Sequence, residues 1–213
     1  MTPAPSIDSL IYDLRRVDFV YGGTHRALQS VDLRLKAGER VAILGSNGCG
    51  KSTLLQIMGG LLFPTAGEAY AFGQKLTEEM FQKASFTAFF RQRVGFLFQN
   101  PDVLLLDEPT AGLDPRTQVW LVEVLEELHS MGKTIITATH DLSILEEIAD
   151  RAYVMAEDHA IVADGSAGEI LDDLDLLLRV NLIHEHAHEH EGFAHRPGHF
   201  HAFTHRHDHP DRP

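Results

Sequence analysis

Hydrophobic and polar positions along most of the chain follow two different periods. Short apolar runs such as 40–45 (RVAILG) and 103–108 (VLLLDE) have the length and aliphatic content of buried strands. Longer segments, of which 114–132 is the clearest, repeat their apolar residues every three or four positions, as amphipathic helices do. Strands that alternate with helices predict an α/β domain with a mainly parallel sheet.

The pattern predicts the following elements. Strands are expected at 15–21, 27–39, 40–45, 67–76, 94–98, 103–108, 134–140, 151–157 and 159–165. Helices are expected at 51–62, 77–93, 114–132, 142–150 and 166–182. The first two strands are expected to form an N-terminal antiparallel β subdomain. Thr77 and Asp114 precede their helices as N-caps, and Gly132 marks a helix end.

The composition changes at His184. Ten of the fourteen histidines lie in 184–213, where bulky aliphatic residues are absent. Such a segment cannot bury a core, so we expect one domain over 1–183 and a histidine-rich tail without regular structure over 184–213. Imidazole is a good ligand for Ni²⁺ and Co²⁺, and the tail is therefore expected to bind these ions weakly.

Charge and cysteine content exclude several classes of protein. The formal net charge of -13 argues against a sequence-independent nucleic-acid binder. The chain has one cysteine, which rules out an internal disulfide and fits a reducing cytoplasm. No apolar run is long enough to span a bilayer, and the first residues do not have a signal-peptide pattern.

A glycine-rich turn stands between a predicted strand and a predicted helix. The run GSNGCGKS matches G-x-x-x-x-G-K-[ST], in which backbone N–H groups and a helix N-terminus surround phosphate groups. Lys51 is expected to reach the terminal phosphates, Ser52 to bind Mg²⁺, and Cys49 to be a neutral filler. The candidate nucleotide-binding residues here are Gly45, Ser46, Asn47, Gly48, Cys49, Gly50, Lys51, Ser52 and Thr53.

The strand at 103–108 ends in two acidic residues. Asp107 is positioned to hold Mg²⁺ directly or through water. Glu108 follows it and is a candidate general base for an attacking water. Two solvated acids at a strand end are common in isolation, but a phosphate loop in the same chain favours the functional interpretation.

With these motifs, the sequence resembles the ATP-binding subunit of ABC transporters over about residues 14–167. The run LLLDEPTAGLDP is similar to the family's Walker B and D-loop segment. The resemblance implies a P-loop NTPase core that uses ATP and Mg²⁺. It places His140 as the γ-phosphate switch, Gln99 as a catalytic and Mg²⁺-sensing residue, and Tyr21 as the ring that stacks on adenine. Taken alone, Tyr21 could equally be a core residue.

Within the family, FQNPD and DEPTAGLDP are most similar to the energy-coupling-factor and cobalt/nickel branch. The resemblance implies transmembrane subunits and a second ATP-binding subunit as partners, at the cytoplasmic face of the membrane.

One part of the family pattern is missing. The family places a helical subdomain with the signature motif LSGGQ between the positions of Gln99 and Asp107, which here are eight residues apart. A parallel strand pair also needs a crossover of about a dozen residues or more. We therefore expect the helical subdomain to be absent between 102 and 103, and one of the two flanking strands to fray, pair differently or be joined by a taut link.

The resemblance implies that each ATP lies between one subunit's phosphate loop and the partner's signature motif. Without that motif we expect Mg·ATP binding with impaired hydrolysis. The leading hypothesis is an ATPase subunit of a cobalt or nickel importer. The alternative is a nucleotide- and metal-binding module without effective ATPase activity, and an ABC ATPase that works outside transport is a third.

Overall fold

The computed structural model describes residues 10–96 and 101–185, and the backbone of 189–190, 193–194 and 200–202. Its principal strands are β1 Leu10–Tyr21, β2 His25–Lys36, β3 Arg40–Leu44, β4 Ala66–Ala71, β5 Gln74–Lys75, β6 Val94–Gly95, β7 Val103–Asp107, β8 Thr134–Thr139, β9 Arg151–Met155 and β10 Ile161–Ser166. Its helices are α1 Lys51–Met58, α2 Glu78–Phe81, α3 Ala84–Arg91, α4 Pro115–Ser130, α5 Leu145–Ile148, α6 Ala167–Asp172 and α7 Leu174–Arg179.

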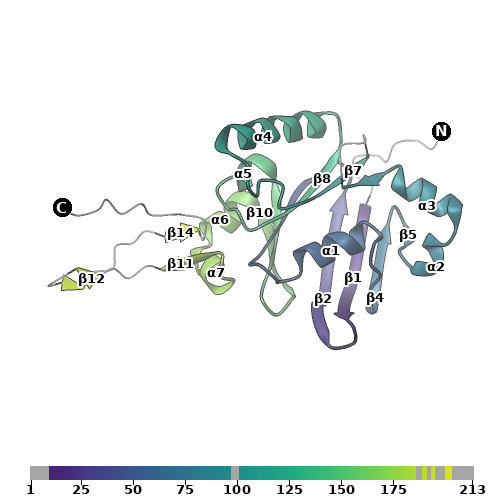
Figure 1. The fold of residues 1–213 in the computed structure, drawn as a ribbon, viewed down its shortest axis with the longest axis horizontal. Helices are drawn as coiled ribbons and strands as arrows, with labels where there is room; N and C mark the ends of the chain where they lie inside the picture. The colour runs from purple at the N-terminus through teal and green to yellow at the C-terminus, as the bar shows by residue number, and fades with distance from the viewer. Residues whose placement is uncertain (1–9, 97–100, 186–188, 191–192, 195–199, 203–213) are drawn as a thin grey trace.

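Two sheets organise the domain (Figure 1). The first is four-stranded and antiparallel, in the order β2-β1-β4-β5. The second is six-stranded, in the order β10-β9-β3-β8-β7-β6, and is parallel except for β10. The expected α/β fold with an N-terminal antiparallel subdomain is confirmed.

Strand alternation divides the core into two layers. Val103 and Leu105 of β7 pack toward α1 and the antiparallel sheet. Leu104 and Leu106 of the same strand pack toward α4, α5, α6 and α7 on the other face. Because successive side chains of a strand point to opposite faces, a continuous apolar run is what a strand buried on both faces requires.

Four predicted helices are shorter or interrupted, the first of them being 51–62, which ends at Met58 as α1. The segment 77–93 breaks into α2 and α3, which places the ring of Phe81 about 5 Å from those of Phe86 and Phe90. The segment 166–182 breaks at Asp173, whose carboxylate accepts a hydrogen bond from the Leu176 N–H and so caps α7. The segment 142–150 keeps only the four residues of α5. At Asp173 a side-chain cap therefore outweighs the helical period.

The strand before the short connection is reduced to two residues. β6 is parallel to β7, with Val94 opposite Val103 and Gly95 opposite Leu104. The chain therefore has to return by only about one residue's rise and one strand spacing of about 4.8 Å, which the seven residues between the strands can span without a helix. The predicted strand 94–98 is corrected to Val94–Gly95, and residues 97 and 98 lie outside the described residues.

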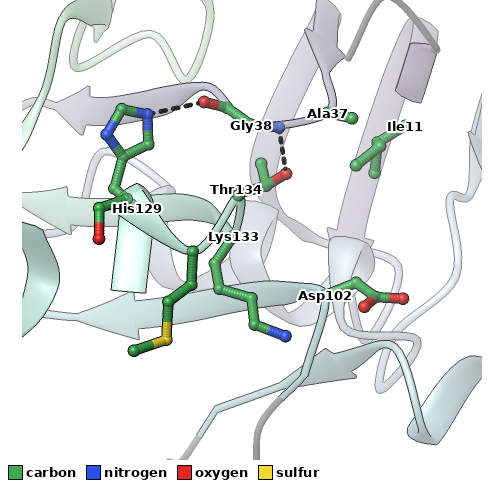
Figure 2. A pocket seen from close by; sticks show the side chains of 10 residues that line it. Ile11, Ala37, Gly38, Asp102, His129, Lys133 and Thr134 are labelled. Atoms are coloured by element: carbon green, nitrogen blue, oxygen red, sulfur yellow. Dashed lines mark hydrogen bonds between the residues drawn. The ribbon is translucent and has the colours of Figure 1, made fainter. Parts of the chain in front are cut away.

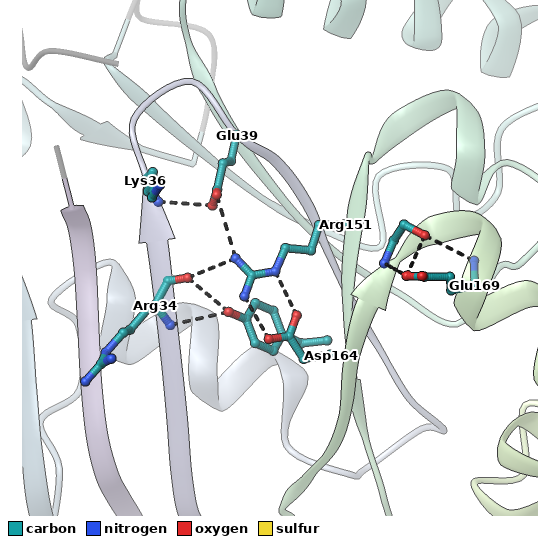
Figure 3. Close-up of polar contacts among 8 residues, drawn as sticks. Arg34, Lys36, Glu39, Arg151, Asp164 and Glu169 are labelled. Carbon is teal, nitrogen blue, oxygen red and sulfur yellow. Dashed lines mark hydrogen bonds and ion pairs between the residues drawn. The ribbon is translucent and has the colours of Figure 1, made fainter. Parts of the chain in front are cut away.

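A polar network joins the two sheets (Figure 3). The guanidinium of Arg151 on β9 donates two hydrogen bonds of 2.7 Å to Asp164 on β10. The same group donates to the backbone oxygen of Arg34 on β2 at 3.3 Å and lies 3.7 Å from Glu39. One side chain thus connects β2 to the edge of the parallel sheet.

In the histidine-rich tail the described backbone contains two short antiparallel pairs. Ile183–Glu185 pairs with Phe200–Ala202, and Glu189–His190 pairs with Phe193–Ala194. These pairs differ from the expected tail without regular structure, and the rest of the tail lies outside the described residues. Ile183 is 6% exposed and packs with the core, which anchors the first of these strands.

Candidate functional site

The phosphate loop runs from the end of β3 to the start of α1. Gly48 and Gly50 have positive φ angles of 83° and 115°. A Cβ on Gly50 would lie 2.2 Å from the backbone oxygen of Ala27, and one on Gly45 would lie 2.5 Å from the sulfur of Cys49. Gly50 is therefore required both by its conformation and by the close approach of the Ala27 backbone, whereas Gly48 is required by conformation and Gly45 by close approach.

Lys51 is the buried cation of this loop. Its side chain is 6% exposed, and Nζ donates to the backbone oxygens of Gly45 at 2.7 Å and Ser46 at 3.2 Å. Nζ also lies 3.5 Å from Oε1 of Glu108. A buried ammonium needs such partners, and phosphate oxygens at the mouth of the loop could replace them.

The carboxylate of Glu108 contacts three side chains, two at the end of β8 and Lys51 at the start of α1. Its Oε1 lies 2.9 Å from Nδ1 of His140, and its Oε2 accepts a hydrogen bond of 3.1 Å from the Thr139 hydroxyl. The backbone of Glu108 has φ 46°, an uncommon value for a residue with a side chain. The carboxylate of Glu108, the predicted base, therefore contacts both Lys51 and His140, the predicted switch histidine.

Tyr21 stands at the end of β1, beside the helix that follows the phosphate loop. Its hydroxyl lies 3.3 Å from the Thr53 hydroxyl and donates to Gln56 Oε1 at 3.4 Å. The side chain is 40% exposed, and its ring packs against Phe19 and His25. Tyr21 is thus a surface ring next to the loop rather than a core residue, which is the position a base-stacking residue needs.

The predicted Mg²⁺ ligands stand at the same edge of the sheet. Ser52 is exposed in the first turn of α1, and Asp107 is exposed at the end of β7. Both are oxygen donors, the class of ligand that Mg²⁺ prefers. Gln99, the third predicted ligand, lies outside the described residues.

Cys49 occupies the interior of the loop, where it is 2% exposed. Burial raises the pKa of its thiol, so the neutral form is favoured at pH 7. This agrees with the expectation of a neutral filler.

The loop is suited to an anion in a further respect. The Ser46 hydroxyl oxygen is buried and has no hydrogen-bond partner among the described residues. Such a group is costly unless something binds it, and phosphate oxygens accept hydrogen bonds from hydroxyls. The residues present therefore fit a polyphosphate, with Ser52 and Asp107 available to an accompanying Mg²⁺.

A separate cleft of about 500 Å³ lies at the other end of the parallel strands (Figure 2). His129 contacts the Gly38 oxygen at 2.9 Å there, and the Gly38 N–H donates to Thr134 at 2.8 Å. Lys133 and Asp102 complete its charged lining. This cleft opens where β3 and β8 begin, whereas the phosphate loop and His140 lie where they end. The two sites are thus distinct.

Three site residues were not predicted from the sequence. Thr139 precedes His140 on the same strand, so its position offered a signal. Gln56 lies one turn beyond the phosphate loop on α1, also within reach of the motif. His159 contacts the Cys49 oxygen at 3.0 Å from 110 positions away, and no local pattern indicates that contact.

None of the helices in the described part of the chain combines the length and apolar character needed to cross a bilayer.

Comparison with known proteins gives two matches to family models. The model described as "ABC transporter" matches residues 28–102. The model described as "AAA domain, putative AbiEii toxin, Type IV TA system" matches residues 86–146.

A putative ABC transporter ATP-binding protein of Methanosarcina acetivorans is 42% identical over 252 residues, which cover 84% of this chain and 91% of the relative. The nickel import ATP-binding protein NikO of Rhodobacter capsulatus is 33% identical, with 86% and 97% covered. The energy-coupling factor transporter ATP-binding protein EcfA of Methanothermobacter thermautotrophicus is 27% identical, with 80% and 75% covered.

Among solved structures, cbiO1 of Clostridium perfringens, described as part of the ABC transporter complex cbiONQ, has a TM-score of 0.68 at 24% identity. The match covers 82% of this chain and 96% of that chain. At this identity the likeness speaks for the fold. Together with the phosphate loop, the shared carboxylate of Glu108 and the close Methanosarcina relative, these findings place the chain in the family of ABC transporter ATP-binding proteins, which are ATPases.

Proposed function

We propose that this chain is the ATP-binding subunit of a nickel or cobalt importer, and that it binds Mg·ATP but hydrolyses it slowly. In this function it works at the cytoplasmic face of the membrane with transmembrane subunits and a second ATP-binding subunit. The observation that carries the nucleotide site is the Glu108 carboxylate, which lies 3.5 Å from Lys51 and 2.9 Å from His140 at the mouth of the phosphate loop.

The site residues act in the following way. Backbone N–H groups of 45–50 and the Lys51 ammonium bind the phosphates, and Tyr21 supports the base. Ser52 and Asp107, with Gln99, hold Mg²⁺, which neutralises charge on the phosphates when bound. Glu108 accepts the proton of the attacking water, and His140 and Thr139 keep its carboxylate oriented.

Slow hydrolysis follows from the short connection between β6 and β7. The alignment with the Methanosarcina relative spans 252 positions, but 84% of 213 residues is about 179, so about 73 positions have no residue here. The match to the ABC transporter model also stops at residue 102, where we infer the missing subdomain. Its loss removes half of each composite site, and preorganised donors around the transferred phosphoryl group are the main source of rate in such reactions.

The choice of nickel or cobalt has two supports. One relative is named for nickel import and another for an energy-coupling factor transporter. The second support is the histidine-rich tail, which we propose binds Ni²⁺ or Co²⁺ weakly. Calorimetric titration of the full chain with NiCl₂ tests this assignment, with His186→Ala, His188→Ala and His190→Ala combined as the comparison. Equal heats would contradict it.

The nucleotide site is tested by titrating the protein with a fluorescent ATP analogue in the presence of Mg²⁺. Lys51→Ala should weaken binding at least tenfold, whereas Lys133→Ala in the remote cleft should not change it. Absence of nucleotide binding by the unmodified chain would refute the proposal.

The missing subdomain is tested by turnover. We expect phosphate release to be slow in the unmodified chain. It should rise when the corresponding segment of the Methanosarcina relative is inserted between Asp102 and Val103, but not with a Gly/Ser segment of equal length. Fast, Lys51-dependent turnover by the unmodified chain would contradict impaired hydrolysis. The second candidate, a nucleotide- and metal-binding module without effective ATPase activity, is also supported by the short connection between β6 and β7. Turnover that stays slow after the insertion would favour this candidate.

A further inference from the structure

His159 lies in the turn between β9 and β10 and contacts the phosphate loop through its ring. Nδ1 stands 3.0 Å from the backbone oxygen of Cys49. Because a carbonyl oxygen can only accept, Nδ1 carries the proton of this hydrogen bond. The contact reaches the loop from another strand pair, 110 residues further along the chain.

The backbone around His159 fixes where this ring stands. Its N–H donates to the Ala156 oxygen at 3.0 Å, and its oxygen accepts from the Gln29 N–H on β2 at 2.9 Å. Its φ of 68° lies in the left-handed region, which disfavours a residue with a Cβ. Strained residues persist where surrounding contacts hold them, and they concentrate at functional sites.

The backbone of the loop segment that His159 contacts makes few hydrogen bonds of its own. Cys49 lies between Gly48 and Gly50, both at positive φ, and its N–H makes a long contact of 3.3 Å to the Ser46 oxygen. Glycines on both sides give the peptide planes freedom to rotate. The hydrogen bond from His159 therefore restrains the Cys49–Gly50 peptide. The N–H group of this peptide belongs to Gly50, the residue that precedes α1.

The ring also connects the loop to the hairpin that bears Tyr21. The ring centroid of His25 lies 6.3 Å from that of His159 and 6.5 Å from that of Tyr21. The rings of Tyr21, His25 and His159 therefore form a continuous row from the proposed adenine-stacking residue, Tyr21, to the phosphate loop at Cys49.

We propose that His159 is a positioning residue that holds the phosphate loop in its binding conformation through the Cys49 carbonyl. It touches no phosphate itself and acts by restricting rotation of the Cys49–Gly50 peptide. The proposal rests on the assignment of 45–53 as the nucleotide site, and it predicts that losing this one donor weakens Mg·ATP binding three- to tenfold.

Three substitutions separate the donor from the backbone conformation. His159→Asn keeps a donor at the position of Nδ1 and tolerates positive φ, so it should behave like the unmodified protein. His159→Gly also tolerates positive φ but lacks the donor. His159→Asp has the shape of the asparagine variant without its N–H, and it serves if the glycine variant does not fold. Asp158→Asn, an exposed change in the same turn, is the control.

Cys49 supplies a readout that does not involve nucleotide. It is the only cysteine of the chain and is 2% exposed, so its alkylation by uncharged iodoacetamide reports opening of the loop. The glycine and aspartate variants should react several-fold faster than the unmodified protein, and the asparagine and Asp158→Asn variants at its rate. Thermal unfolding midpoints establish that each variant is folded.

The two measurements distinguish the possible failures. Equal alkylation rates and equal Mg·ATP affinities in all folded variants would overturn the positioning role while leaving the nucleotide site intact. If no variant binds nucleotide, including the unmodified chain, the proposed function fails, and the alkylation rates still decide whether His159 holds the loop. Rates that rise equally in the asparagine and glycine variants would overturn the hydrogen bond as the cause.

Discussion

The Oε1 atom of Glu108 lies 2.9 Å from Nδ1 of His140. The same oxygen stands 3.5 Å from the Lys51 ammonium, so one carboxylate serves two partners in the site. A carboxylate that holds the lysine also places negative charge where the phosphates of ATP have to bind.

Neutralising Glu108 should therefore strengthen nucleotide binding. Glu108→Gln keeps the size of the side chain but removes its charge, and we expect Mg·ATP affinity to rise about five- to tenfold at low salt, equivalent to about 1 kcal/mol. Fluorescent-nucleotide titration measures the change, and the gain should shrink at high salt. Glu123→Gln on α4 is the matched control. Unchanged or weaker binding in the Glu108 variant would show that its charge does not oppose the phosphates.

Two glycine substitutions separate backbone strain from steric conflict. Gly50→Ala combines a positive φ with a Cβ 2.2 Å from the Ala27 oxygen, whereas Gly73→Ala has a positive φ of 72° but no atom within 4 Å. We expect Gly73→Ala to cost about 1 kcal/mol of unfolding free energy and Gly50→Ala at least about 3 kcal/mol, with loss of ATP binding. Urea unfolding measures both. Similar costs would mean that the loop moves away from Ala27 without penalty.

The pH dependence of stability includes a contribution from Asp13. A hydrogen bond from Arg15 lowers the pKa of this carboxyl below its ordinary value, and Arg34 adds to the effect while burial opposes it. The unfolded state then binds more protons between the two pKa values, so the stabilisation is complete above the ordinary pKa of about 3.9 and is lost as pH falls through the lower, folded value.

Asp13→Asn should therefore lower the unfolding free energy by about 1 kcal/mol at pH 7, because the two arginine partners are largely exposed to solvent. The difference from the unmodified protein should persist down to about pH 5 and close below about pH 4. Urea unfolding across this range measures it, with the exposed Asp172→Asn as control. A difference that does not depend on pH would attribute the effect to packing.

Arg151 connects the two sheets in a way that lysine cannot reproduce. Its planar guanidinium donates to both oxygens of Asp164 and to the Arg34 backbone oxygen. Arg151→Lys should lower the unfolding free energy by about 1–2 kcal/mol, whereas Arg91→Lys on the exposed face of α3 should have no measurable effect. Thermal unfolding compares the two. Equal midpoints would mean that the network adds little to the association of the sheets.

The sequence predicted most of the fold because its signals are local. The apolar runs of β3 and β7 marked strands buried on both faces, and Asp114 does cap α4 as expected, accepting from the N–H groups of Arg116 and Thr117. Helix boundaries were less well predicted. Asp173 divides the last predicted helix because its side chain caps a new helix, α7. Whether a helix continues or a new one is capped depends on energies of about 1 kcal/mol, which the spacing of apolar residues does not reveal.

By itself, the sequence determined the α/β class, the phosphate loop and the candidate residues at the strand ends, since each depends on spacing along the chain. Only the tertiary structure decided that Glu108 is shared by Lys51 and His140, that β6 keeps two residues beside β7, and that His159 reaches the Cys49 carbonyl. These relationships join segments up to 110 positions apart. They depend on the order of the strands in the sheet and on which side chains this order brings into contact. Both are determined by packing of the two core layers rather than by any local sequence pattern.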